Sequence, residues 1–155
     1  MIETFLVFLN FLGQIVIPNI CIFTDYLNMF TMGLSDSWRQ WLLVFGWINV
    51  IFFARIHYDL GQSWSPILEI KKDHKLITRG VYKYLRHPMY THIWLWVIGQ
   101  GFILNNSFVL ISGIVFWSIL YFIRVGKEEQ MMLQQFGSEY KDYMMNTPRI
   151  IPFIK

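Results

Sequence analysis

The chain has 155 residues, of which 55% are hydrophobic, 19% aromatic and only 15% charged, and its mean hydropathy is +0.40. This balance excludes an ordinary soluble domain. Unpaired backbone groups cannot be left in lipid, and a bilayer core takes about 20 apolar residues per helix, so the composition predicts an all-α membrane protein with about four transmembrane helices. The formal net charge of +3 requires no nucleic-acid partner, because basic loops beside an anionic leaflet account for it.

The first two apolar runs cover residues 2–23 and 38–58. The first run lacks the basic start and the small-residue cleavage site of a signal peptide, so we expect it to be a retained span, kinked near Pro18. The second run has no strong helix breaker. The single cysteine, Cys21, lies in the first run and excludes an internal disulfide.

Two further apolar runs, residues 89–104 and 107–125, are separated by a predicted tight turn at Asn105 and Asn106. After Gly126 the pattern becomes amphipathic, which predicts a cytoplasmic helix near the C-terminus. The chain is therefore predicted to be a polytopic membrane protein. We expect a single membrane domain, residues 1–155, made of two N-terminal transmembrane helices in residues 1–58, a cytoplasmic loop in residues 59–88 and a C-terminal core in residues 76–155.

Charge placement predicts the orientation of these spans. The connection over residues 23–37 carries Asp25 and Asp36 but no Lys or Arg, whereas residues 59–88 and the tail after residue 125 are basic. Because positive loops stay on the cytoplasmic side, we expect a multi-pass protein with both termini in the cytoplasm.

The stretch RGVYKYLRHPMY, residues 79–90, places three tyrosines and several basic residues just before the third apolar run. Pro88 disfavours a helical His87, so we expect a helix that begins at or just after Pro88. The free N–H groups at such a helix start suit an anionic ligand. The alternative is an interfacial anchor, since Tyr, Arg and Lys are common where helices leave the bilayer. The tyrosines that could wall a pocket there are Tyr82, Tyr84 and Tyr90.

A second polar group follows the fourth run, in the sequence RVGKEEQMML. Arg124 precedes Glu128 by four residues, so the two share a helix face, with Glu129 adjacent. Paired carboxylates near a membrane surface could hold a cation; the alternative is a solvated face with an intrahelical ion pair. The histidines show no convincing metal-ligand spacing, and there is no phosphate loop, dinucleotide fingerprint or serine nucleophile elbow, so we expect no metal site.

Together, the segments LITRGVYKYLRHPMYTHIWLWVIGQGFILNN and RVGKEEQMMLQQFGSEYKDYMMNTPRIIPFIK resemble the isoprenylcysteine carboxyl methyltransferase family of integral membrane methyltransferases. The likeness covers residues 76–155. It consists of an Arg-His-Pro-x-Tyr turn, a helical hairpin, a Glu-Glu pair, a Phe-Gly-x-Glu-Tyr-x-x-Tyr segment and a closing Ile-Pro. LGQSWS, residues 60–65, is similar to a segment that precedes the cofactor region in the family, whereas the first two runs match only as generic apolar helices.

The resemblance implies that S-adenosyl-L-methionine is the cofactor and that residues 76–155 form a cofactor-binding methyltransferase core on the cytoplasmic side. Aromatic rings and carboxylates suit the two cationic groups of this ligand, and Arg, His or a helix start suits its carboxylate. By the same resemblance, the contacts come from His87, Tyr90, Glu128 and Glu129, with the backbone of Ile77, Gly80, Val81 and Tyr82 alongside.

The implied reaction is methyl transfer to a carboxylate of a lipidic or prenylcysteine-like acceptor that arrives from the bilayer. A carboxylate is already ionised at neutral pH, so the enzyme has mainly to align the reactants and exclude water. Arg124 is the candidate for steering that carboxylate. If the acceptor were an amine, a base would be needed, and Glu129 or His87 would be the candidates.

Other functions stay open at this point. A phospholipid or small-molecule methyltransferase would act on an amine or a thiol. A membrane reductase with a related helical core would use a nicotinamide cofactor and prefer extra basic residues for its phosphates, which the Glu pair disfavours. A non-catalytic membrane protein would keep the helices without the polar pocket. For the methyltransferase, the expected partners are membrane lipids and a membrane-embedded acceptor, with no nucleic acid.

Overall fold

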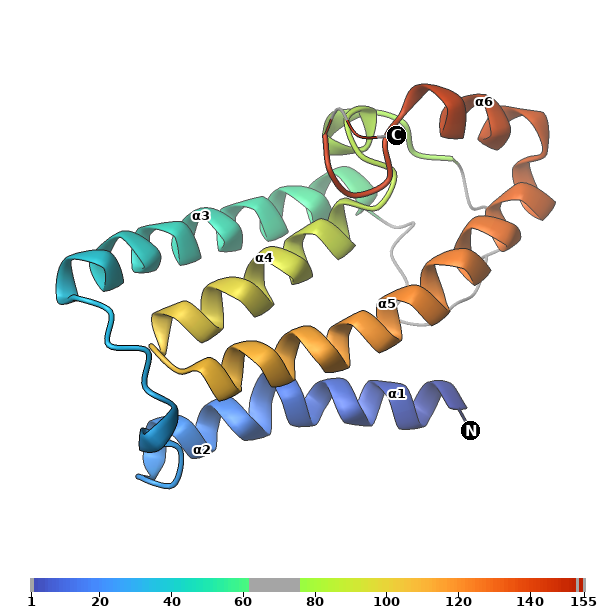
Figure 1. Cartoon of the computed structure of the whole chain (residues 1–155). Helices are drawn as coiled ribbons and strands as arrows, with labels where there is room; N and C mark the ends of the chain where they lie inside the picture. The colour runs from blue at the N-terminus through green and yellow to red at the C-terminus, as the bar shows by residue number, and fades with distance from the viewer. Residues whose placement is uncertain (1, 62–75, 153, 155) are drawn as a thin grey trace. The chain divides into compact units, whose positions relative to one another are not determined.

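The apolar runs of the sequence form helices in the computed structural model, which describes residues 2–61, 76–152 and 154 (Figure 1). Within these residues the only strand-like feature is an isolated bridge between Thr31 and Asn106, so the all-α prediction is confirmed. The helical elements, in chain order, are α1 (Ile2–Phe11), η1 (Leu12–Val16), α2 (Ile17–Phe23), η2 (Asn28–Phe30), α3 (Asp36–Leu60), η4 (Gly80–Lys83), α4 (Pro88–Ile103), α5 (Ser107–Phe136) and α6 (Ser138–Asn146).

Three helices in the described part of the chain are long and apolar enough to cross a membrane: Thr4–Phe23, Asp36–Leu60 and Ser107–Phe136. The predicted third span is α4, which has only 16 residues. At about 1.5 Å per residue it is about 24 Å long, short of a hydrocarbon core of about 30 Å. Its length is fixed at both ends, because Pro88 begins it and Asn105, at a φ of 52°, ends it.

The described chain falls into two compact units. The first comprises Met1–Val50 and Ile93–Phe122, and the second comprises Ile51–His92 and Ile123–Lys155. Helices α3, α4 and α5 each contribute to both units.

In the first unit, the distortion predicted near Pro18 takes the form of the π-helical turn η1, one turn before the proline. Proline has no N–H, so the carbonyl of Gln14, four residues earlier, loses its ordinary α-helical donor. The side-chain amide of Gln100 in α4 donates to this carbonyl at 3.2 Å. The amide of Asn10 likewise donates to the carbonyl of Phe116 in α5 at 3.1 Å. These polar contacts tie the first span to α4 and α5.

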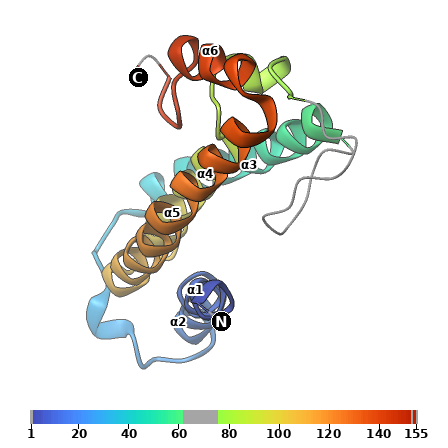
Figure 2. The ribbon, with the colours of Figure 1, turned by 90° about the vertical axis from the view of Figure 1, so that its right-hand side faces the viewer.

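Also in the first unit, α4 and α5 run side by side as a hairpin (Figures 1 and 2). A Cβ on Gly101 would lie 2.5 Å from the Cβ of Leu110, so only glycine allows this approach. The Asn106 side-chain carbonyl oxygen accepts from the backbone N–H of Phe108 and Val109, at 3.0 and 3.1 Å. The predicted turn is thus confirmed, with Asn106 as the cap of α5.

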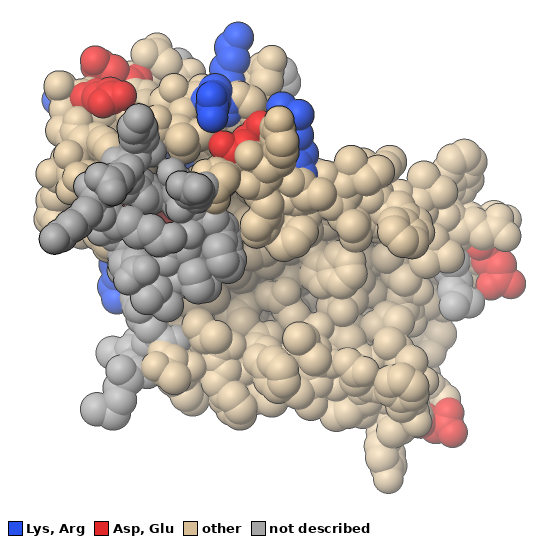
Figure 3. Space-filling model, turned by 180° about the vertical axis from the view of Figure 1, so that it is seen from behind, with Lys and Arg blue, Asp and Glu red and all other residues tan. Residues whose placement is uncertain are grey.

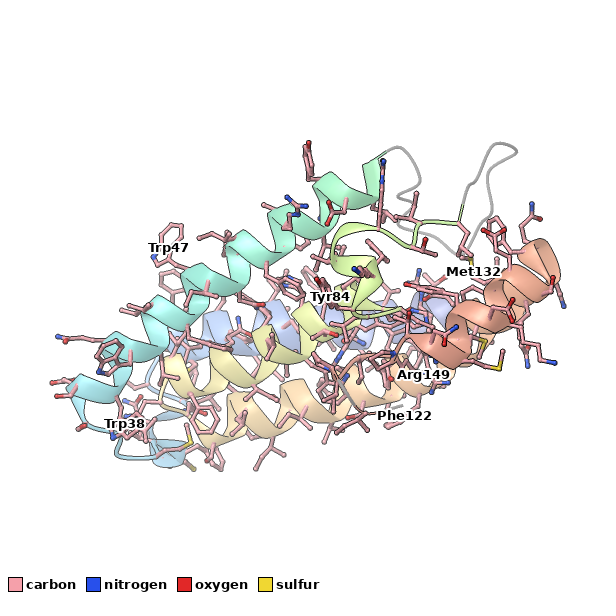
Figure 4. The ribbon with its side chains drawn as sticks, turned by 90° about the horizontal axis from the view of Figure 1, so that it is seen from above. Trp38, Trp47, Tyr84, Phe122, Met132 and Arg149 are labelled. Atoms are coloured by element: carbon pink, nitrogen blue, oxygen red, sulfur yellow. The ribbon has the colours of Figure 1, made fainter. Side chains whose placement is uncertain are left out.

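The exposed surface of the helices is mostly apolar. Trp38, Trp41 and Trp47 of α3 are 65%, 71% and 70% exposed, and Figure 4 shows Trp47 pointing away from the neighbouring helices. On the face in Figure 3, most of the described surface is formed by uncharged residues, and charged ones gather in a few places. Such a surface suits lipid rather than water.

The amphipathic segment after Gly126 is helical, as predicted. Its first part is the continuation of α5 through Gly126 to Phe136. The break comes at Gly137, whose φ is +54°, a conformation accessible mainly to glycine. The remaining part forms the short helix α6.

Candidate functional site

The Arg-His-Pro turn in the second unit is held by the segment that follows α6, residues 147–152, which we call the C-terminal segment. The backbone N–H of Arg86 donates to the carbonyl of Pro148 at 2.8 Å, and that of His87 to the carbonyl of Arg149 at 2.9 Å. The chain is not helical here, and α4 begins at Pro88, as the sequence predicts. The backbone donors of this non-helical stretch thereby find the partners that buried N–H groups require, on a segment far along the chain.

Helix α6 holds the same turn through Tyr143. Its hydroxyl donates to the carbonyl of Tyr82 at 2.5 Å and lies 3.3 Å from that of Leu85. Burial, together with the neighbouring Tyr140 and Tyr82, raises the pKa of Tyr143. The hydroxyl therefore stays protonated at neutral pH and remains a donor.

Glu129, Arg86, Arg149 and His87 form a charged cluster. Glu129 lies at its centre, and its side chain is 6% exposed. Arg86 binds its Oε1 through Nη2 at 3.0 Å and Nε at 3.2 Å. Arg149 binds Oε2 through Nη2 at 2.5 Å and Oε1 through Nε at 3.1 Å. Nε2 of His87 lies 3.3 Å from Oε1. One buried carboxylate thus joins α5, the turn and the C-terminal segment.

Arg86 is almost as buried as its partner, with a side chain 8% exposed. Its Nη1 donates to the carbonyls of Met144, at 2.9 Å, and Thr147. Both the charge and the donors of the guanidinium are therefore satisfied inside the protein, which a buried cation requires.

Glu128, one residue earlier, is more accessible, with a side chain 23% exposed. Its Oε1 lies 3.1 Å from Nε of Arg124, the helix-face ion pair that the sequence predicts, and its Oε2 lies 3.5 Å from Nδ1 of His87. His87 therefore bridges the two glutamates. Burial lowers the pKa of His87, but the hydrogen bonds to Glu128 and Glu129 outweigh it, and the net pKa is raised.

Tyr90 completes the group of predicted residues on this side. Its ring is stacked on His87, with centroids 5.4 Å apart and planes at 15°, and its side chain also interacts with Glu128. The structure thus brings together five predicted residues from two distant segments: Arg124, Glu128, Glu129, His87 and Tyr90.

The predicted backbone residues lie in and before η4. Ile77 is in the non-helical segment ahead of it and is partly buried, Gly80 and Val81 begin it, and Tyr82 is buried within it. Tyr84, labelled in Figure 4, is not buried with Tyr82 and Tyr90, because it is 64% exposed. The ammonium of Lys83 lies 5.9 Å from its ring, an arrangement typical of an interfacial anchor.

Three residues that hold the cluster and the turn were not among the predicted site residues, although one of them, Tyr143, ends the Phe-Gly-x-Glu-Tyr-x-x-Tyr segment of the resemblance. Arg149 and Tyr143 reach the turn from the C-terminal segment and α6. Asp59, in the last turn of α3, accepts a hydrogen bond from the N–H of Val81 at 2.9 Å. These hydrogen bonds join residues far apart in the sequence, and no periodic sequence pattern predicts such contacts. LGQSWS, residues 60–65, lies mostly outside the described residues.

Fold and site together define an all-helical, polytopic membrane protein with a buried ion cluster in its second unit. The model of the "Isoprenylcysteine carboxyl methyltransferase (ICMT) family" matches residues 41–134. The chain belongs to this family, so the resemblance is confirmed. The match begins within α3, and the second apolar run is therefore more than the generic helix that the sequence suggested.

Curated relatives and a solved structure agree with this membership. Protein-S-isoprenylcysteine O-methyltransferase B of Arabidopsis thaliana is 30% identical over 133 residues, which are 81% of this chain and 66% of that protein. The Schizosaccharomyces pombe protein-S-isoprenylcysteine O-methyltransferase is 39% identical over 97 residues, 61% of this chain and 41% of that one. The structure of "the eukaryotic intramembrane Ras methyltransferase ICMT" matches with a TM-score of 0.67 and 29% identity, over 75% of this chain and 42% of that one.

The matched parts cover only a portion of these relatives. In the two curated proteins, the matched residues are 66% and 41% of the full length.

Proposed function

We propose that this chain is an S-adenosyl-L-methionine-dependent methyltransferase of the membrane that transfers a methyl group to a carboxylate of a lipidic or prenylcysteine-like acceptor. The curated relatives are named as protein-S-isoprenylcysteine O-methyltransferases, and the family description names a carboxyl methyltransferase. The active site is proposed to face the cytoplasm.

One observation carries the proposal: the Arg-His-Pro-x-Tyr turn and the Glu128–Glu129 pair form one connected cluster through His87. Residues that only anchor helices at an interface would keep their polar groups near the headgroups and water, whereas Glu129 and Arg86 are buried. Buried charges are costly, and their joint burial is typical of a functional site.

The donor set of the cluster suits S-adenosyl-L-methionine. Glu128 is only partly buried and would hold the ammonium, while the ring of Tyr90, which is stacked on His87, would lie against the adenine or the sulfonium. The side chain of Arg149 is 44% exposed and would pair with the carboxylate. When bound, the cofactor would supply an electrophilic methyl group. The backbone of Ile77, Gly80, Val81 and Tyr82 would flank it.

For a carboxylate acceptor, the residues of this chain have to orient the nucleophile and keep water out. Arg124 lies one helical turn before Glu128 and is 21% exposed, so its guanidinium would steer the acceptor. Proximity alone is worth roughly 7–11 kcal/mol in well-oriented reactions. No proton has to be removed from an ionised carboxylate.

The sequence predicts that Glu129 contacts the cofactor or acts as a base, and we propose a structural role for it instead. Both of its oxygens accept from cationic donors, on Arg86, Arg149 and His87. This favours Glu129 as the residue that fixes the turn, rather than as a ligand to the cofactor or a base for an amine acceptor.

Calorimetric titration of the purified protein with S-adenosyl-L-methionine, S-adenosylhomocysteine and NADPH tests the proposal. We expect the first two to bind and NADPH not to bind. Binding of NADPH alone would indicate a reductase, and no binding of any of the three would indicate a non-catalytic protein.

A variant pair tests the location of the site. His87→Ala removes the bridge between the glutamates, and a charge-assisted hydrogen bond of this kind is worth about 1.5–3 kcal/mol, so S-adenosylhomocysteine should bind about tenfold more weakly or worse. His57→Ala is the control. His57 lies in α3, where its Nδ1 is 3.1 Å from the carbonyl of Phe53, and it is far in the sequence from both glutamates. Equal losses in both variants would argue against this site.

A further inference from the structure

Asp59 is a buried carboxylate that the proposed chemistry does not use. It lies in the last turn of α3, and its side chain is 6% exposed. Its Oδ2 accepts from the backbone N–H of Val81 at 2.9 Å and from Nε of Arg55 at 3.1 Å. Its Oδ1 lies 3.1 Å from Nη2 of Arg55. The carboxylate therefore faces two partners, one on its own helix and one on the turn.

Gly80 leaves free the space that this carboxylate occupies. Its φ is +60°, and a Cβ added to it would overlap the carboxylate of Asp59. The glycine is thus required twice, by the backbone conformation and by the closeness of the carboxylate.

The contact caps η4. The residue at the N-cap position, Arg79, makes no side-chain capping bond. Asp59 supplies an acceptor to the turn instead, from 22 residues earlier in the chain. An anionic acceptor at the first N–H groups of a helical turn is the favourable arrangement.

The segment from η4 to the Arg-His-Pro turn, residues 80–88, is held at three places. Asp59 binds its start, Tyr143 binds the carbonyls of Tyr82 and Leu85, and the C-terminal segment binds Arg86 and His87. Of these contacts, only that of Asp59 fixes η4 to α3.

We propose that Asp59 is a positioning residue of the methyl-donor site, which acts by fixing the Gly80–Lys83 turn. This inference rests on the proposed function, because that function places the backbone of the turn beside the donor. The ion pair with Arg55 is secondary, since the Arg55 side chain is 56% exposed and pairs with an exposed partner contribute little.

Three variants separate these contributions. Asp59→Ala removes the acceptor, and Asp59→Asn removes the charge but keeps one carbonyl oxygen for the N–H of Val81. Asp142→Asn, at an exposed position of α6, is the chemically matched control. Two quantities are measured on the full-length protein: hydrogen exchange of the peptide covering residues 80–85, and affinity for S-adenosylhomocysteine.

We expect Asp59→Ala to speed exchange in residues 80–85 and to weaken S-adenosylhomocysteine binding by about tenfold, the effect of losing one charge-assisted hydrogen bond. Asp59→Asn should recover most of the affinity, and Asp142→Asn should match the parent in both measurements. If Asp59 contributed only to global stability, Asp59→Ala would lower the melting temperature of the protein. Hydrogen exchange in residues 80–85 would then change no more than exchange in the rest of the chain.

Parent-like exchange in residues 80–85 of Asp59→Ala would overturn the inference, as would faster exchange with unchanged affinity in a parent that binds S-adenosylhomocysteine. If the parent itself does not bind, the proposed function fails, and the exchange data still show whether Asp59 holds the turn.

Discussion

Glu128 and Glu129 are neighbours in the sequence but differ in their surroundings. Glu129 is enclosed by Arg86, Arg149 and His87, whereas Glu128 faces Arg124 and His87 and is more exposed. Consecutive residues of a helix point about 100° apart, so one faces the turn while the other lies towards its edge. The pair therefore combines a carboxylate that cations enclose with one that is partly exposed.

Arg124 provides a test of the proposed acceptor. If it orients an acceptor carboxylate, Arg124→Ala should leave S-adenosylhomocysteine affinity within a few-fold of the parent while methyl transfer falls roughly 10²-fold, the scale of one positioned electrostatic contact. Arg124→Lys should rescue only part of the rate, because an ammonium cannot reproduce a two-pronged guanidinium. The measurements are calorimetric titration and initial rates with a prenylcysteine analogue.

The competing role for Arg124 is to hold Glu128, with which it forms an ion pair at 3.1 Å. In that case affinity and rate should fall together. A parallel loss of both would remove Arg124 from the acceptor site.

His87 predicts a pH dependence of stability. Its pKa is raised in the folded protein by the two glutamates, against the effect of burial. A raised folded pKa means that the stabilisation is complete below the unfolded pKa of about 6.5 and is lost as the pH rises through the folded value. We expect the melting temperature of the parent to fall more steeply than that of His87→Gln as the pH rises above about 6.5. Parallel curves for the two proteins would contradict this assignment.

At the scale of elements, the hairpin of α4 and α5 depends on a small residue. Gly101→Ala would place a Cβ 2.5 Å from a side-chain atom and 2.6 Å from the Cα of Leu110. Backbone cannot give way easily, so we expect a loss of about 1–3 kcal/mol in the free energy of unfolding.

Gly126→Ala is the matched change, since nothing lies within 4 Å of a Cβ at that helical position. Alanine favours a helix interior over glycine by about 0.5–1 kcal/mol, so this variant should be neutral or more stable. Thermal unfolding of both variants in one detergent gives the comparison. Equal destabilisation would show that the packing at Gly101 is not the cause.

At the scale of the whole molecule, the charge asymmetry predicts that residues after α5 and the connection before α3 lie on opposite sides of the membrane. In a Cys21→Ser background, a cysteine at Ser35 should react with an impermeant reagent from outside, and one at Lys141 only after permeabilisation. Both positions are exposed. Labelling of both from the same side would contradict the proposed orientation. Lys72, in the middle of the predicted cytoplasmic loop, lies outside the described residues.

The helical membrane architecture and most of the element boundaries follow from the sequence alone. Long apolar runs can only be helices in lipid, Pro88 marks the start of α4, and Asn106 marks the start of α5. These signals are local, because they depend on backbone hydrogen bonding and on residues a few positions apart. The motifs near His87 and Glu128 were equally visible, as was the family to which they belong.

The pairing of these motifs with the rest of the chain is visible only in the three-dimensional structure. Nothing local indicates that Arg149 binds Glu129, that Tyr143 holds the carbonyl of Tyr82, or that Asp59 caps a turn 22 residues later. Each contact joins segments far apart in the sequence, and a buried charge takes whichever partner the fold brings within hydrogen-bond distance. The sequence names the charged residues, but their pairing, and with it the difference between Glu128 and Glu129, follows from packing.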